Sequence, residues 1–162
     1  MSYSITPLLT GVRNPDQGIM TYQQGYGTPI WLPIWAFLLQ GGNKNVLVDT
    51  GLDENELMTP AGFSEETGLE PKSIVDCLAQ AGLKPDDIDI VIHTHLHNDH
   101  CENDYKCANA RFYVHEKELE SIHDPHPLDY RYLEDYIEDV EEAGQIEVMT
   151  KDTQVLPGIE CI

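Results

Sequence analysis

The stretch that decides the fold reads Asp86-Asp87-Ile88-Asp89-Ile90-Val91-Ile92, then His93, then Thr94-His95-Leu96-His97-Asn98-Asp99-His100. Its first part alternates polar and apolar residues and then becomes β-branched, which predicts a strand that leaves a turn. Its last part places three imidazoles and one carboxylate in a short segment. Open α/β sheets place their sites where strands end, so the pattern predicts a metal site at the end of a sheet strand.

The candidate metal ligands are His95, His97, Asp99 and His100. Imidazole nitrogen and carboxylate oxygen suit zinc, at roughly 2.0–2.2 Å, and also iron, nickel or manganese. Four ligands so close in sequence would crowd one tetrahedral ion. We therefore predict two divalent ions, one held by His95 and His97 and the other by Asp99 and His100. The alternative is a histidine-rich tract that binds metal only adventitiously.

Two metal ions would carry a bridging hydroxide that attacks a carbonyl while one ion polarises the carbonyl oxygen. Asp99 is the predicted catalytic residue, because it would hold one of those ions. The other histidines lie outside this motif: His93 belongs to the strand that precedes it, and His115, His123 and His126 have no matched neighbours. We predict that these four histidines are structural or solvated.

The motif T-H-x-H-x-D-H, preceded by Val46-Leu47-Val48-Asp49-Thr50-Gly51, resembles the metallo-β-lactamase superfamily of metal-dependent hydrolases. Within that superfamily, the block L-P-I-W at Leu32–Trp35 resembles the L-P-V-W block of the N-acyl homoserine lactonases and their lactonase-like relatives. The segments Asn109–Val114 and Val155–Glu160 also fall in the order of that family. The resemblance covers nearly all 162 residues.

The resemblance implies an α/β fold of the metallo-β-lactamase αββα sandwich type, with residues 1–162 as the N-terminal part of a single domain. In that family a T-P-G-H-type loop, a bridging aspartate and a last histidine complete the metal shells. These ligands have no counterpart before Ile162, so we expect this chain to supply about half of the sandwich. An isolated half would expose apolar residues of Phe37–Leu39, Val46–Val48 and Ile90–Ile92. We therefore expect self-association, or pairing with a missing C-terminal half.

Three functions follow from the resemblance. The first is a metal-dependent hydrolase that opens a lactone or a related ester through a metal-bound hydroxide. The second is another hydrolase of the superfamily, such as a glyoxalase-type thioesterase. The third is a catalytically silent metal-binding remnant, and we expect the isolated 162-residue chain to be inactive. A redox diiron protein is disfavoured, because His97 stands where that branch usually has a glutamate.

The composition excludes several classes of partner. Nine basic and 29 acidic residues give a net charge of −20, which repels phosphate backbones and argues against nucleic acid. No apolar run approaches the roughly 20 residues that span a membrane, and no secretory segment is evident at the N-terminus. We therefore predict a cytoplasmic protein that acts on a small molecule. The four cysteines show neither metal-type spacing nor a disulfide framework.

The remaining elements follow from periodicity and turn residues. We expect strands at Tyr3–Val12, Gly18–Gln24, Ile34–Leu39 and Val46–Asp49, the last two joined by a hairpin at Gly41–Asn45. A helix should open at Pro71 and close at Gly82. Leu52–Gly68 should be a loop near the site entrance. A second helix should carry Tyr130, Leu133, Ile137 and Val140 on one face and acidic residues on the other.

Two further features leave alternatives open. Asp49 ends its strand in a V-D-T-G turn, where it either caps the turn or accepts the N–H of a ligating imidazole and so fixes its tautomer. The aromatic residues Trp31, Trp35, Tyr22 and Tyr26 either wall an apolar acyl pocket or belong to the core.

Overall fold

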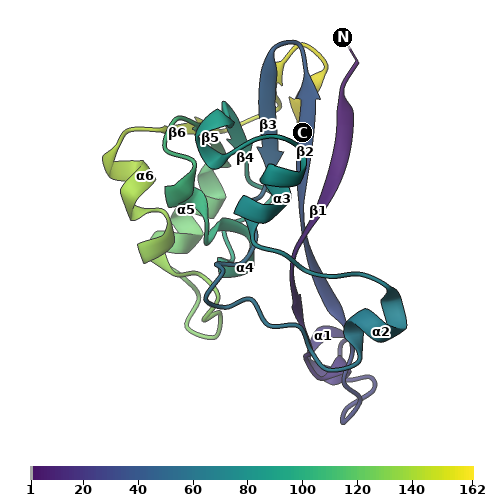
Figure 1. Ribbon diagram of the computed structural model, residues 1–162. Helices are drawn as coiled ribbons and strands as arrows, with labels where there is room; N and C mark the ends of the chain where they lie inside the picture. Colours follow the sequence, from purple (N-terminus) through teal and green to yellow (C-terminus); the bar gives the residue numbers. More distant parts are fainter. Residues whose placement is uncertain (1) are drawn as a thin grey trace.

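The computed structural model describes residues 2–162 and contains one six-stranded sheet with helices against it (Figure 1). The sheet consists of β1 (Ser4–Arg13), β2 (Leu32–Gly41), β3 (Lys44–Val48), β4 (Ile90–Ile92), β5 (Arg111–His115) and β6 (Ile146–Met149). A separate hairpin is formed by β7 (Thr153–Leu156) and β8 (Ile159–Cys161). The helices are α1 (Gln17–Met20), α2 (Phe63–Thr67), α3 (Ile74–Gln80), α4 (Asn98–Cys101), α5 (Glu116–His123) and α6 (Glu138–Glu142), with short 3₁₀ turns η1 (Pro85–Asp87), η2 (Asp104–Lys106) and η3 (Glu134–Tyr136).

The strand order places the predicted metal segment at the carboxyl ends of the central strands. The strands follow the order β1-β2-β3-β4-β5-β6; β1 to β3 are antiparallel and β3 to β6 are parallel. Val48 of β3 pairs with Ile92 of β4, so the residues that follow both strands emerge side by side. The V-D-T-G turn and the histidine motif therefore meet at the carboxyl ends of the parallel strands, as the sequence predicts.

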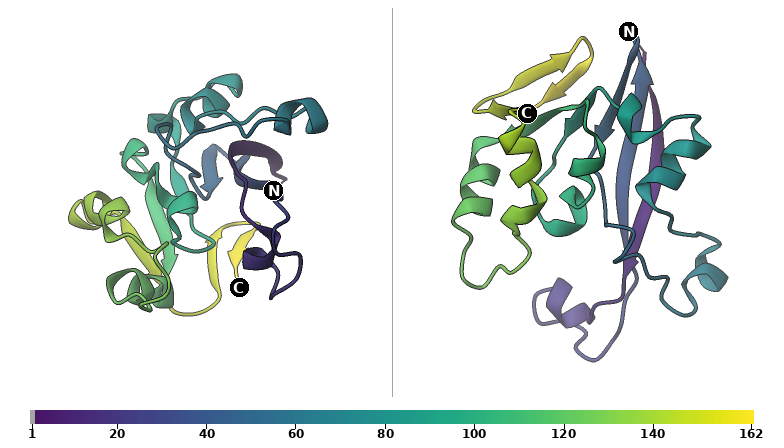
Figure 2. Two further views of the ribbon diagram at one scale, coloured as in Figure 1. Left: turned by 90° about the horizontal axis from the view of Figure 1, so that it is seen from below. Right: turned by 60° about the vertical axis from the view of Figure 1, so that its left-hand side comes forward.

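Strand alternation divides the apolar side chains between two cores. Leu38, Leu47, Val91 and Phe112 are fully buried in the larger core, which the helices cover. Val46, Ile90 and Ile92 point to the opposite face of the sheet. Figure 2 shows helices α3, α5 and α6 and the β7–β8 hairpin on opposite sides of the sheet.

The β7–β8 hairpin changes one expectation. Val46, Ile90 and Ile92 were expected to face water, but they are at most 7% exposed because Val155 and its hairpin neighbours pack against them. Only part of the predicted apolar surface remains open, and Phe37 at 38% exposure belongs to it. The prediction of a largely wet inner face was therefore wrong for β3 and β4.

Most expected elements form, with shifted ends. The hairpin between β2 and β3 turns through Gly42 and Asn43, whose φ angles of 60° and 70° suit a type I′ turn. Helix α3 begins after Ser73 rather than at Pro71, because the Ser73 side chain accepts the Asp76 N–H at 3.1 Å.

Three local predictions were wrong. Gly18–Gln24 is not a strand, because the Asp16 side chain caps α1 through Gly18 N–H at 2.8 Å. The predicted loop Leu52–Gly68 contains α2, where buried Phe63 packs against Trp31 and Trp35. Those two tryptophans are partly buried and pack against the small cluster that contains Phe63. The second predicted helix is broken into η3 and α6.

The part of the chain that the structure describes has no helix both long and apolar enough to cross a membrane. This finding agrees with the absence of a long apolar run in the sequence.

A pH-dependent contact joins α5 to the segment that follows it. His123 Nδ1 lies 2.7 Å from Glu134 Oε1 and its Nε2 lies 3.0 Å from Glu141 Oε1. Both nitrogens can donate only in the imidazolium form, and the two carboxylates raise the pKa of His123, with Glu134 the larger cause. Because the folded-state pKa is raised, the stabilisation is fully present below the unfolded-state value near 6.5 and is lost as pH rises through the folded-state value.

We expect His123→Ala to lower the free energy of unfolding by less than about 1 kcal/mol at pH 6, because the pair is largely exposed, and by less still at pH 9. Urea denaturation at both pH values measures the difference. His126→Ala is the control, since within residues 2–162 its imidazole forms no ion pair. A His123 effect that grows with pH would contradict this interpretation.

Candidate metal centre

The histidine motif begins where β4 ends. His93 N–H still donates to Tyr113 O of β5 at 3.0 Å, and the chain then turns away from the sheet. The turn is held by Asp49, whose carboxylate accepts Thr94 N–H at 2.8 Å and Thr94 Oγ1–H at 2.7 Å. Helix α4 starts at Asn98 and carries Asp99 and His100 in its single turn. The predicted ligands thus come from a loop and the helix turn that directly follows it.

The structure brings all four predicted ligands together. The ring centroid of His95 lies 4.6 Å from that of His97 and 4.0 Å from that of His100. Asp99 Oδ1 lies 3.9 Å from His100 Nε2. Two ligands on one tetrahedral zinc ion are separated by about 3.4 Å at ordinary bond lengths, so the Asp99 and His100 atoms lie near the spacing of a shared ion.

Each of the three imidazoles has one ring nitrogen engaged by the protein. His95 Nδ1 lies 3.0 Å from Thr94 Oγ1, and His100 Nδ1 lies 2.8 Å from Asp49 Oδ2. His97 Nε2 lies 3.3 Å from Asp129 Oδ2. Within residues 2–162, no hydrogen bond reaches the other ring nitrogen of any of the three. One nitrogen of each ring is therefore oriented and the other is free to bind an ion.

The pKa shifts of the histidines have identifiable causes. Burial lowers the pKa of His95, and the neighbouring rings of His100 and His97 lower it further, which favours the neutral form that ligates metal. Burial also opposes the charged form of His100, but its hydrogen bond to Asp49 outweighs burial and raises its pKa.

The chemistry of these donors fits zinc or a similar divalent ion, because three imidazole rings and a carboxylate lie close together at the end of a sheet. Among the described residues, no three His, Cys, Asp or Glu side chains already surround one point as a metal site.

Asp49 occupies a strained and buried position. Its φ of 60° lies in the left-handed region, which is uncommon for a residue other than glycine. Burial alone would raise the pKa of Asp49, but the hydrogen bond from His100 and the nearby His93 imidazole outweigh burial and hold it well below its usual range. The structure thus gives Asp49 the role of accepting an imidazole N–H, one of the two roles that its sequence position allows.

His93 belongs to a buried polar network rather than to the solvent. Its Nε2 lies 2.8 Å from Asp104 Oδ2 and its Nδ1 lies 3.6 Å from Asp49 Oδ1, and all three side chains are at most 4% exposed. Burial would lower the pKa of His93, but the two carboxylates raise it to about 10, Asp104 being the stronger. His93 therefore lies between two buried carboxylates as part of the support of the turn, and the prediction that His93 is structural holds.

Asn103 also supports the turn, a role that no motif in the sequence indicates. Its Nδ2 donates to the carbonyl oxygens of Thr50, Gly51 and Leu52 at 3.0, 3.2 and 2.7 Å. Asp104 accepts Thr50 Oγ1–H at 2.8 Å. These contacts join η2 to the V-D-T-G turn, so the residues after the histidine motif hold the turn that positions Asp49.

A more distant segment packs against the His97 side of the loop. Asn98 N–H donates to Arg131 O at 2.9 Å, and the Tyr132 ring lies 4.5 Å from the His97 ring. Glu118 of α5 accepts Leu96 N–H at 2.9 Å and Tyr132 O–H at 3.0 Å. Asp129, Arg131, Tyr132 and Glu118 were not predicted as site residues, because nothing in their spacing links them to the motif.

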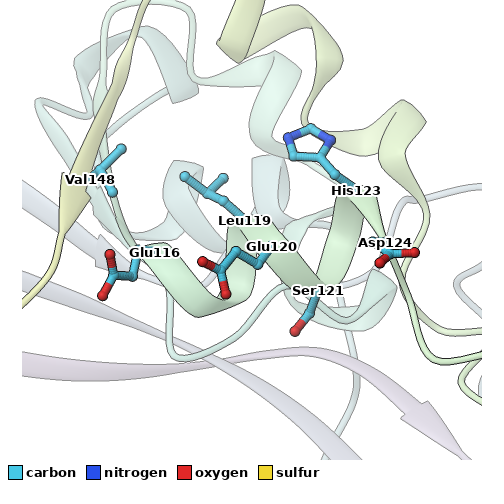
Figure 3. Close-up of a pocket in the computed structure, with 7 residues that line it drawn as sticks. All are labelled: Glu116, Leu119, Glu120, Ser121, His123, Asp124 and Val148. Carbon is cyan, nitrogen blue, oxygen red and sulfur yellow. The ribbon is translucent and has the colours of Figure 1, made fainter.

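A cavity with other lining residues lies elsewhere. It is an open groove of about 720 Å³ beside α5 and β6, shown in Figure 3. Its lining residues are Glu116, Leu119, Glu120, Ser121, His123, Asp124 and Val148. None of the four predicted ligands lines this groove, so it does not define the metal centre.

A strand that ends in a V-D-T-G turn, parallel to a strand that ends in H-x-H-x-D-H, defines a class of metal-dependent hydrolases. The family model of the metallo-beta-lactamase superfamily matches residues 29–159. The chain belongs to this superfamily.

Relatives with assigned activities are lactonases or hydrolases. An N-acyl homoserine lactonase of Bacillus cereus is 28% identical over 145 residues, covering 84% of this chain and 55% of its own length. A probable metal-dependent hydrolase from Staphylococcus aureus superposes with a TM-score of 0.74 at 25% identity, over 98% of this chain and 62% of that one.

An N-acyl homoserine lactone hydrolase, solved with the product N-hexanoyl-L-homoserine at its catalytic metal centre, has a TM-score of 0.74 at 26% identity. The superposition covers 63% of that hydrolase and 96% of this chain. The chain thus spans about half the length of the curated relatives it matches, and the fold prediction is confirmed.

We expect Asp49→Ala to destabilise the metal-free protein by about 3–5 kcal/mol, because it leaves the Thr94 N–H, the Thr94 hydroxyl and His100 Nδ1 without their common acceptor. Chemical denaturation in the presence of a chelator measures this loss. Asp86→Ala, at an exposed aspartate, is the control and should cost less than about 0.5 kcal/mol. Equal losses in the two variants would show that Asp49 does not hold the turn.

Proposed function

We propose that the full-length protein to which residues 1–162 belong is a metal-dependent hydrolase that opens lactones or related esters. The assays below use that full-length protein, because the 162-residue chain alone is expected to be inactive. The observation that carries the proposal is the convergence of His95, His97, Asp99 and His100 at the carboxyl ends of β3 and β4, with one free nitrogen on each imidazole. Lactonase relatives with the same fold support the substrate class.

His95 and His97 would hold one divalent ion, and Asp99 and His100 would hold a second, with zinc as the metal that this donor set suits. When bound, such ions supply Lewis acidity and lower the pKa of water to near 7. The protein's own part is orientation. Thr94 and Asp49 hold the His95 and His100 rings so that each presents one nitrogen.

The charge of the chain is compatible with this substrate class. A net charge of −20 repels polyanions such as nucleic acids, while a lactone or ester linkage is itself uncharged. Ring opening turns the neutral ester into a carboxylate, so the same field would favour release of the product.

We expect His97→Ala and Asp99→Ala each to reduce lactone hydrolysis by more than the roughly 10- to 100-fold that loss of a partner behind a metal ligand costs. Each variant removes one donor from a different ion. The zinc-loaded protein is assayed with an N-acyl homoserine lactone by proton release. His123→Ala is the control and should retain activity, because His123 contacts Glu134 and Glu141 rather than the metal loop.

A thioester substrate, assayed in parallel, separates the alternative hydrolase. Turnover of the thioester without turnover of the lactone would replace the substrate class and retain the metal centre. Similar losses in all three variants would mean that the site is placed wrongly, and zinc binding without hydrolysis of either substrate would indicate a silent metal-binding protein.

A further inference from the structure

We propose that Asp129, held in place by Arg131, is a positioning residue that keeps the proton of His97 on Nε2 and leaves Nδ1 as its metal-binding atom. The inference rests on the proposed metal centre and adds to it a residue that lies outside the histidine motif.

The contact between the two side chains selects one nitrogen. His97 Nε2 lies 3.3 Å from Asp129 Oδ2, at the long end of the hydrogen-bond range, with the side chains 16% and 21% exposed. An ionised carboxylate can only accept hydrogen bonds, so Nε2 must donate. Nδ1 is then the only nitrogen of this ring with a lone pair to offer a metal ion.

Arg131 fixes the direction of the Asp129 carboxylate. Arg131 Nε donates to Oδ1 at 2.7 Å and Nη2 donates to Oδ2 at 2.8 Å, which is the two-pronged geometry that a guanidinium forms with a carboxylate. This pairing also lowers the pKa of Asp129 below its usual range. The oxygen that faces His97 is therefore held in place by a neighbour two residues away.

The segment that carries Asp129 is attached to the metal loop on both sides of His97. Arg131 O accepts the N–H of Asn98 at 2.9 Å, directly after His97. Tyr132 lies against the His97 ring and donates its hydroxyl to Glu118, which also accepts the N–H of Leu96 directly before His97. The loop and the segment therefore form one hydrogen-bonded unit around this imidazole.

The molecule contains a matched arrangement at the other predicted ion. Asp49 Oδ2 lies 2.8 Å from Nδ1 of His100, so the free nitrogen of that ring is Nε2, the atom that faces Asp99. Carboxylates behind ligating histidines set the tautomer and raise the basicity of the ligand. Asp49 and Asp129 would thus perform the same task from opposite sides, on opposite nitrogens of their rings.

Nitrogen-15 NMR of the histidine rings tests the inference directly. In the metal-free protein at pH 8 we expect a His97 Nε2–H proton that exchanges slowly enough to be observed. In the zinc-loaded protein we expect His97 to bind through Nδ1, and His95 and His100 through Nε2. Binding of His97 through Nε2, or a protonated Nδ1 in the metal-free protein, would overturn the proposal.

Metal affinity tests the role of Asp129 separately. Competition with a chelator should show Asp129→Ala weakening one of two zinc ions by about 10- to 100-fold, with the ion at Asp99 and His100 unchanged. Asp124→Ala is the matched control, since Asp124 lies five residues earlier and within residues 2–162 its side chain forms no hydrogen bond or ion pair. Asp129→Leu, which keeps the size of the side chain, replaces the alanine variant if that variant does not fold.

The outcomes are distinguishable from failure of the proposed function. Unchanged affinity for both ions, or an equal loss at both, would remove Asp129 from a positioning role. A protein that binds zinc with the predicted nitrogens but hydrolyses no ester would refute the proposed function and leave this inference intact. A protein that binds no zinc refutes the metal centre, and the protected Nε2–H of His97 in the metal-free protein still decides which nitrogen Asp129 holds.

Discussion

The arrangement of the site depends on one buried carboxylate at the end of β3. Asp49 accepts two hydrogen bonds from Thr94 and one from His100, so it joins the carboxyl ends of two parallel strands and the first turn of α4. The backbone must adopt φ of 60° to aim the carboxylate there, a conformation that costs energy for aspartate. The hydrogen bonds that Asp49 accepts, and the hold of Asn103 on the following turn, maintain that conformation.

A buried carboxylate in turn requires a compensating charge. Asp49 and Asp104 are both nearly inaccessible to water, and His93 lies between them with only 1% of its side chain exposed. Removing the imidazole from this group leaves two carboxylates without a compensating charge in a region of low dielectric constant, which costs far more than an exposed ion pair contributes. The histidines of this region therefore have two different functions. His93 lies between the buried carboxylates of Asp49 and Asp104, which hold the turn. His95, His97 and His100 face the space where ions would bind.

The sequence could predict the parts of the molecule that are encoded locally. The β3 and β4 strands, the Gly42-Asn43 turn and the ligand motif each depend on residues close together in the chain, and all are present in the structure. The prediction of a strand at Gly18–Gln24 was wrong because the capping Asp16 side chain starts a helix there, which outweighed a weak strand pattern. The prediction that the inner face of β4 is exposed was wrong because the β7–β8 hairpin covers it. That hairpin follows some sixty residues later, and periodicity does not show which segment will pack on a face.

The same distinction separates the ligands from the groups that orient them. The donors His95 to His100 are close together in the sequence. One loop and the helix turn after it therefore bring these four side chains to one region. A ring nitrogen, however, is selected by whatever lies behind the ring, and that space belongs to other elements. Strand pairing places Asp49 behind the His100 ring, and a segment after α5 places Asp129 behind the His97 ring. Only the folded chain therefore shows which nitrogen each histidine presents.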